Sequence, residues 1–228
     1  MTRILVSLVR LPQPHIGAFR FDPVDGTVTL TNRPLTCTGM ILENEGASRA
    51  IRPSQVYQTT DSFASDMLML HDNHFLQPPH AALDEDDAGD RTTIRTLLRT
   101  VTHHFILPER RDGPFIMQLD GFHQSNIFVD DDWNVTCLID LEWISALPVE
   151  MLSVPYWLTD CSIDSIMGDD YITFDQARQA FLTIMDERVK ASKLEHDMPI
   201  VDIMRETWDS KATWFWLHSL HQWLAFCL

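Results

Sequence analysis

The sequence predicts a single α+β domain that is mainly helical, and two observations lead to this fold class. Long segments on both sides of the middle of the chain carry apolar residues at the three-to-four spacing of helices with one buried face. Between them, short apolar runs flank turn-forming Asp, Asn and Gly residues, which is typical of antiparallel strands. With 228 residues, 45% of them apolar and 10% aromatic, the chain can bury a substantial core.

The first sixty residues are expected to contain little helix. Residues 1–10 are apolar for a short run only, and we interpret them as the tail of a helix. The segments 16–21 and 27–30 flank the sequence Asp-Pro-Val-Asp-Gly and therefore predict a β-hairpin. Residues 33–60 contain two prolines as breaks and are predicted to be irregular.

Two helices are predicted next. Asp61 and Ser62 can cap a helix that runs to about His74. After a Pro-Pro break, an acidic run near Asp84 is expected to begin a second helix that ends near Phe105. The apolar stripe of this second helix consists of Ile94, Leu97, Leu98, Val101 and Phe105.

Two further helices are predicted in the last third of the chain. A capping-box pattern at 173–176 opens a helix to about Lys193, and Pro199 begins a last helix to about Phe226. The segment 214–217 near the end of this helix is strongly apolar, so it forms either core or a face left bare.

Residues 115–143 carry the most informative pattern. A strand at 115–118 is followed by a loop, a strand at 127–129, a turn rich in Asp and Asn, and a strand at 135–139. The strand at 135–139, which contains Cys137, is expected to be buried because its residues are mostly apolar.

The two ends of this hairpin should meet, which would place Asn126 and Asp140 side by side. An amide oxygen and a carboxylate held close together are hard oxygen ligands suited to Mg²⁺. Phosphoryl transfer on kinase-like folds uses such a pair to hold the metal ions that clamp the nucleotide phosphates. The alternative is that both residues only make turns, in which Asp and Asn are common.

At this point the sequence resembles a known family. Phe122–Asn126 matches the end of the catalytic loop His-Gly-Asp-Leu-His-x-x-Asn of the aminoglycoside phosphotransferase and choline kinase-like proteins. Leu138–Trp143 matches their metal strand, Ile-Asp-x-Glu, and Pro148 with Glu150 resembles a Pro-x-x-Asp pattern at a helix start. The resemblance covers roughly residues 1–200 and is strongest to the large fungal branch.

The resemblance implies the large, C-terminal lobe of a protein-kinase-like fold across residues 1–228, with a catalytic loop and metal hairpin at 115–143 and a helical remainder at 150–228. It implies transfer of phosphate from ATP to a small-molecule hydroxyl. Asn126 and Asp140 would hold Mg²⁺, and His123 would be a structural residue of the catalytic loop.

Two departures from the family pattern bear on activity. The position of the catalytic Asp, five residues before Asn126, is Gly121 in this sequence, and Leu119 stands where the family has its His. Asp120 is one residue early, so it is a displaced candidate for the catalytic base. Gly121 tolerates unusual dihedrals and could bend the backbone to bring Asp120 back.

The second departure concerns the nucleotide. Kinase-like enzymes hold ATP with a Gly-rich loop and a strand lysine that precede the catalytic loop. The three lysines, Lys190, Lys193 and Lys211, all follow it, and the chain has no G-x-G sequence. We therefore expect the N-terminal nucleotide lobe to be absent, the chain to begin just after the hinge, and ATP binding to be doubtful.

Two functions stay open: a phosphotransferase that is inactive as this isolated chain, or a non-catalytic, pseudokinase-like binding lobe or truncated gene product. The net charge of −16 argues against nucleic acid as a partner, since nucleic acid needs a basic face. This charge would suit a cationic substrate by electrostatic steering, although acidic turns and helix starts alone can explain it.

Other features of the sequence add little chemistry. No apolar run reaches eighteen residues, so no membrane partner is expected, and four widely spaced cysteines fit reduced thiols in a cytoplasmic protein. The pairs His71 with His74 and His218 with His221 each share a helix face, but neither pair has a third ligand of a Zn²⁺ site at matching spacing.

Overall fold

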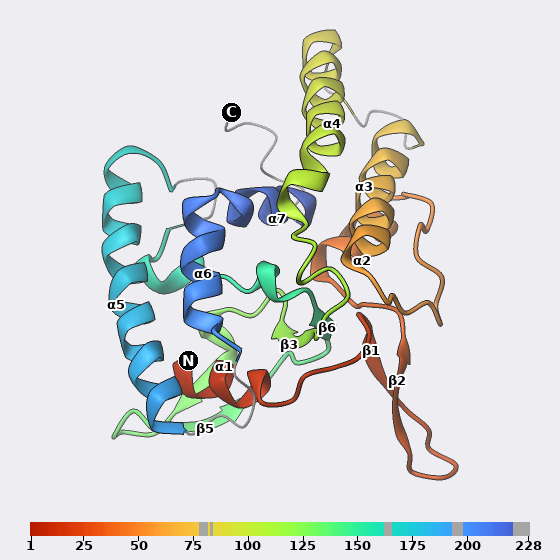
Figure 1. The fold of residues 1–228 in the computed structure, drawn as a ribbon. Coiled ribbons are helices and arrows are strands. Elements are labelled where there is room, and N and C mark those ends of the chain that lie inside the picture. The colour runs from red at the N-terminus through yellow and green to blue at the C-terminus, as the bar shows by residue number, and fades with distance from the viewer. Residues whose placement is uncertain (78–81, 83, 162–165, 193–197, 221–228) are drawn as a thin grey trace.

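The structure, a computed structural model, describes residues 1–77, 82, 84–161, 166–192 and 198–220, and the side chains of 218–220 are left aside. The described part is mainly helical α+β with three two-stranded antiparallel sheets, which confirms the predicted class (Figure 1). The helices are α1 (Thr2–Val9), α2 (Cys37–Asn44), α3 (Thr60–Leu76), α4 (Glu85–Phe105), α5 (Gly168–Ser192), α6 (Ile200–Asp209) and α7 (Ala212–Leu220). The strands are β1 (Ala18–Phe21), β2 (Val28–Asn32), β3 (Ile116–Leu119), β4 (Ile127–Val129), β5 (Val135–Leu138) and β6 (Ile144–Leu147). Three 3-10 helices complete the description: η1 (Gln124–Asn126), η2 (Val149–Met151) and η3 (Tyr156–Thr159).

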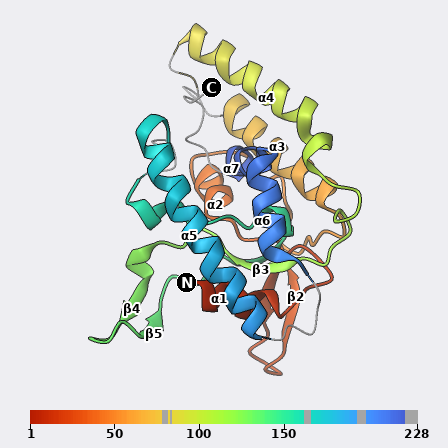
Figure 2. The same cartoon turned by 60° about the vertical axis from the view of Figure 1, so that its left-hand side comes forward.

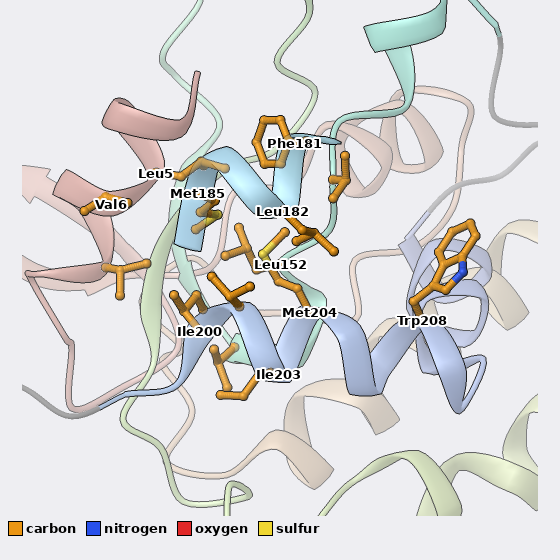
Figure 3. Close-up of a cluster of buried hydrophobic side chains, with 14 of the residues drawn as sticks. Leu5, Val6, Leu152, Phe181, Leu182, Met185, Ile200, Ile203, Met204 and Trp208 are labelled. Carbon is orange, nitrogen blue, oxygen red and sulfur yellow. The ribbon is translucent and has the colours of Figure 1, made fainter. Parts of the chain in front are cut away.

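One hydrophobic cluster joins the first helix to the C-terminal helices. Leu5 and Val6 of α1 pack with Met185 of α5 and with Ile200 and Met204 of α6 (Figure 3). The apolar residues of α6 recur three to four positions apart, so one face of this helix is buried while Glu206 stays exposed on another. This cluster attaches the expected helix tail at 1–10 to the body of the molecule.

A second cluster surrounds the central β3–β6 sheet. Phe115 and Met117 pack with Phe63 of α3 and with Phe215 and Trp216 of α7. The apolar segment at 214–217 is therefore largely core, since Phe215 and Trp216 are both nearly inaccessible to solvent. Trp223 and the end of the predicted last helix lie outside the described residues.

The partner of β3 was not predicted. Strand β6 pairs antiparallel with β3, with Ile116 opposite Leu147 and Leu119 opposite Ile144. Only four residues separate Trp143 from Pro148, which is too short a run for a periodic signal. This sheet carries the chain from β3 directly into the loop that contains Asp120 and Gly121.

The prediction that residues 33–60 are irregular is wrong, because this segment contains α2. The Thr36 side chain accepts a hydrogen bond from the Gly39 backbone N–H at 3.1 Å and so caps the helix. A Cβ at Gly39 would lie 2.7 Å from Thr36 Oγ1, so the cap requires glycine there. The helix is short and contains this glycine, which is unfavourable inside a helix, and both features weakened its sequence signal.

Two predicted boundaries in the last third of the chain are also wrong. Helix α5 begins at Gly168, so Thr173 lies inside the helix and its hydroxyl donates to the Asp169 carbonyl at 3.2 Å. The helix expected from Pro199 is divided at Lys211, which has a left-handed φ of 68° between α6 and α7. This turn lets α7 pack across α6 and against η2.

Two elements are more exposed than expected. The β4–β5 hairpin projects away from the helical body (Figure 2), and Phe128 and Val135 are about half exposed. The prediction that Cys137 is buried is therefore wrong, because it lies on the open face of this hairpin. Helix α4 also extends beyond the body (Figure 1), and none of its residues is fully buried.

Candidate functional site

The β4–β5 hairpin brings together the two residues proposed as metal ligands. Ile127 pairs with Leu138, and the Ile139 backbone N–H donates to the Asn126 carbonyl at 3.1 Å. This pairing places Asn126 beside Asp140, whose Oδ2 accepts a hydrogen bond from Asn126 Nδ2 at 2.5 Å. The expected juxtaposition is confirmed, and the role of the two residues as Mg²⁺ ligands stays a prediction.

The orientation of the Asn126 amide is set by the start of η1. Its Oδ1 accepts from the His123 backbone N–H at 2.9 Å, while the His123 ring caps the Ser125 N–H. Since the oxygen of an amide accepts hydrogen bonds and its NH₂ only donates, the NH₂ of Asn126 faces the Asp140 carboxylate. His123 thus caps η1, and its role as a structural residue of a catalytic loop stays a prediction.

The donor set fits a hard cation in kind, because it offers an amide oxygen and a carboxylate. Asn126 is 7% exposed, whereas Asp140 is exposed and has a φ of 55°. The second lone pair of Asn126 Oδ1 can serve a metal while the first accepts from the backbone. Asn126 Oδ1 and the Asp140 carboxylate would hold a bound Mg²⁺, whereas the amide group that faces Asp140 in this structure is the NH₂.

Asp120 is held by the start of α2. Its Oδ2 accepts from the backbone N–H of Cys37, the first residue of α2, at 2.7 Å. A carboxylate at a helix N-terminus is stabilised by the unpaired N–H groups and by the helix dipole. Cys37 and Asp120 are 83 residues apart in the sequence, so no local sequence pattern could have predicted this hydrogen bond.

Gly121 has the unusual backbone conformation that the sequence suggested, with a φ of 63°. A Cβ at this position would lie 3.0 Å from the Cβ of Cys37. The contact with α2 disfavours any side chain at this position, while the positive φ alone is one that aspartate tolerates better than most residues. The bend is present, and whether it makes Asp120 a base stays a prediction.

The surroundings of Asp120 are acidic and partly buried. Burial raises the pKa of the Cys37 thiol, and the negative charges of Asp120 and Glu142 raise it further. Burial likewise raises the pKa of Tyr156, with smaller contributions from Cys37 and Asp120. Sequence reasoning missed Cys37 and Tyr156 as neighbours of the loop, because both arrive from distant elements.

A cavity of about 120 Å³ lies beside the loop. Asp120, Gly121 and Tyr156 line one part of it, and Met151 at the end of η2 and the following Leu152 form part of its apolar wall. Trp157 also lines the cavity and fixes it to the loop, since its Nε1–H donates to the Phe122 carbonyl at 2.8 Å. The cavity can admit a small group beside a carboxylate.

The described lysines do not fit an ATP site. Lys190 pairs with Asp186 on α5 at 2.7 Å, and Lys211 forms the turn before α7, whereas Lys193 lies outside the described residues. Neither described lysine is therefore placed as the strand lysine that holds the phosphates of ATP in a kinase.

Other metal sites find no support in the described part of the chain, where no group of three His, Cys, Asp or Glu side chains could hold an ion. His74 is instead paired with Glu45 at 2.9 Å. The side chains of His218 and His221 lie outside the described residues.

No described helix combines the length and apolar character needed to cross a membrane. Searches with the full chain find no matching family model, no matching curated protein and no matching solved structure.

Proposed function

We propose that the chain is the large lobe of a kinase-like small-molecule phosphotransferase and does not transfer phosphate by itself. In this proposal Asn126 and Asp140 hold Mg²⁺ at the end of the β4–β5 hairpin, and the cell compartment is the cytoplasm. The observation that carries the proposal is the contact between Asn126 Nδ2 and Asp140 Oδ2, which joins two oxygen-bearing side chains 14 residues apart. Phosphoryl transfer on kinase-like folds holds its metal ions with the oxygens of an Asn and an Asp, so the pairing of these two residue types supports the proposal, although the contact itself is a hydrogen bond from the amide nitrogen.

The cavity beside Asp120 supports a small-molecule acceptor. The cavity is lined by Asp120, the candidate base of the loop. Its volume of about 120 Å³ suits part of a small substrate. The negative charge of Asp120 and of Glu142 nearby, with a net charge of −16, favours an acceptor that carries a cation.

A second candidate function is a non-catalytic lobe that binds a ligand or partner. One observation favours it: Asp120 Oδ2 is bonded to the Cys37 backbone N–H at the start of α2. A carboxylate that stabilises a helix start is a weaker base, because the N–H groups favour its charged form. Asp120 would then hold α2 against the loop without taking a proton from a substrate.

The two candidates are separated by divalent-cation binding at Asn126 and Asp140, which only the phosphotransferase lobe requires. Turnover by the chain itself is tested by an assay of ADP release from MgATP with a panel of small amino alcohols and alcohols. We expect no release above background with the chain alone. Release that depends on the acceptor and is lost in Asp120→Asn would support the catalytic candidate. Asp132→Asn, which makes the same charge change on the exposed turn of the hairpin, is the matched control.

A further inference from the structure

Glu150 is a buried carboxyl group with an unsatisfied oxygen. It lies on η2, where its side chain is 3% exposed, and its Oε2 has no hydrogen-bond partner among the described residues. A carboxylate buried in this way is costly unless it is paired or protonated. Burial accordingly raises the pKa of Glu150 to about 7.

Arg110 provides a matching unsatisfied donor. Its Nη2 donates to Glu206 Oε2 of α6 at 2.7 Å, whereas its Nη1 is buried without an acceptor among the described residues. The charge of Arg110 acts on Glu150 and favours the ionised carboxyl, so the two groups are close. The guanidinium is thus bonded to Glu206 and acts through its charge on Glu150.

The other charged groups around Glu150 come from two segments. The negative charges of Glu109, beside Arg110 in the loop after α4, and of Glu206 on α6 disfavour ionisation of Glu150. Helices α6 and α7 both pack against η2, and the described side chains of α7 from Ala212 to Leu217 are not ionisable. Asp202 and Arg205 of α6 are paired with each other at 2.9 Å.

We propose that Glu150, Arg110 and Glu206 form a proton-operated switch. While Glu150 is protonated, Arg110 pairs with Glu206 alone, as the structure describes. When Glu150 releases its proton to solvent, Arg110 Nη1 turns to the new carboxylate and either bridges both acids or leaves Glu206. The new contact pairs Arg110 Nη1 with the Glu150 carboxylate, so two buried polar atoms gain a hydrogen-bond partner. The free energy of this bond drives the exchange.

The switch bears on the cavity beside Asp120 through η2. Glu150 is followed directly by Met151 and Leu152, which line that cavity. The Met151 backbone N–H is anchored to the Pro148 carbonyl at 3.0 Å, and Gln118 Nε2 donates to the same carbonyl at 2.7 Å. With the backbone held in this way, the new charge on Glu150 and the turned Arg110 guanidinium lie directly beside one wall of the cavity, whatever reaction or ligand the cavity serves.

The switch is tested by NMR of the full chain without metal or nucleotide, with labelled Glu carboxyls, Arg guanidinium groups and Met methyls, from about pH 5.5 to about pH 8.5. We expect the Glu150 carboxyl to titrate with a midpoint near 7. The Arg110 guanidinium and the Met151 methyl should shift with the same midpoint. In Glu150→Gln both signals should stay constant, and Asp202→Asn should leave all three titrations unchanged.

A second variant covers the case in which Glu150→Gln does not fold. Glu206→Gln removes a negative charge near Glu150 and leaves Arg110 available to it, so the Glu150 midpoint should move downward. The switch is wrong if Arg110 does not follow the Glu150 titration, or if Glu206→Gln leaves the midpoint in place. Neither outcome depends on Mg²⁺ binding at Asn126 and Asp140, so the proposed function is tested separately.

Discussion

Two residues with left-handed backbone conformations set the positions of the candidate carboxylates. Asp140, two residues after the end of β5, has a φ of 55°, and its side chain contacts Asn126. Gly121 has a φ of 63° directly after Asp120 and lies against Cys37. Asp is among the few side chains that tolerate this conformation, whereas Gly121 combines it with a close approach to α2.

Replacing Gly121 by alanine tests that close approach. Gly121→Ala should lower the free energy of unfolding by about 2 kcal/mol, because it adds backbone strain and a Cβ contact with Cys37. Gly26→Ala, at a positive φ with no neighbour within 4 Å, separates the strain from the contact and should cost less. Gly89→Ala, in the open α4 helix, should instead stabilise by up to about 1 kcal/mol. Urea unfolding of the three variants decides, and equal effects of Gly121→Ala and Gly26→Ala would contradict the contact.

The raised pKa of Glu150 predicts that the free energy of unfolding depends on pH. Burial raises its pKa from 4.5 to about 7 in the folded chain. The folded state therefore binds the proton more tightly between these values, and the stability from this group is full below about pH 4.5 and lost as the pH rises to about 7. The loss is on the order of 3 kcal/mol. Urea unfolding of Glu150→Gln should show a flatter profile in this window, while Asp202→Asn should keep the wild-type slope. A wild-type slope in Glu150→Gln would contradict the assignment.

At the level of elements, local patterns predicted what local forces determine. Helix α4 follows from its cap Asp84 and its apolar spacing, and both hairpins follow from their turns. Helix α3 follows from apolar spacing alone, because its cap is Thr59 and the predicted Asp61 and Ser62 lie inside the helix. Helix α2 and strand β6 were missed because their partners are remote: the α2 start meets Asp120, and β6 pairs with β3. The Asn126–Asp140 contact was predictable because one hairpin creates it, whereas the Asp120–Cys37 contact was not.

The exposed β4–β5 hairpin predicts unequal cysteine reactivity. In a Cys227→Ser background, Cys137 should react with a thiol reagent under native conditions at least about tenfold faster than Cys37. Cys137 is exposed on β5, whereas Cys37 is half-buried and its pKa is raised by burial. Mass mapping of the modified peptides over time gives both rates. Equal rates in the folded chain would show that the hairpin is covered or that α2 is open.

At the scale of the molecule, two packed clusters form a helical body around the β3–β6 sheet, and the β4–β5 hairpin extends from this body (Figure 2). The candidate metal pair lies on the extension, and the cavity beside Asp120 lies in the body. Composition predicted a core-forming helical protein with a strongly acidic surface. It could not predict the break at Lys211 between α6 and α7, or that Met151 and Leu152 line the cavity. Both features depend on packing between segments that are remote in the sequence.

The central claim is that Asn126 and Asp140 hold a divalent cation. Mn²⁺ can stand in for Mg²⁺ with oxygen ligands, and its binding to the full chain can be measured by electron paramagnetic resonance. We predict one site that is weakened at least about tenfold in Asp140→Asn and is retained in Asp132→Asn, which alters the same charge on the same hairpin. Equal Mn²⁺ binding by the wild-type chain and both variants, or no binding by any of them, would contradict the claim.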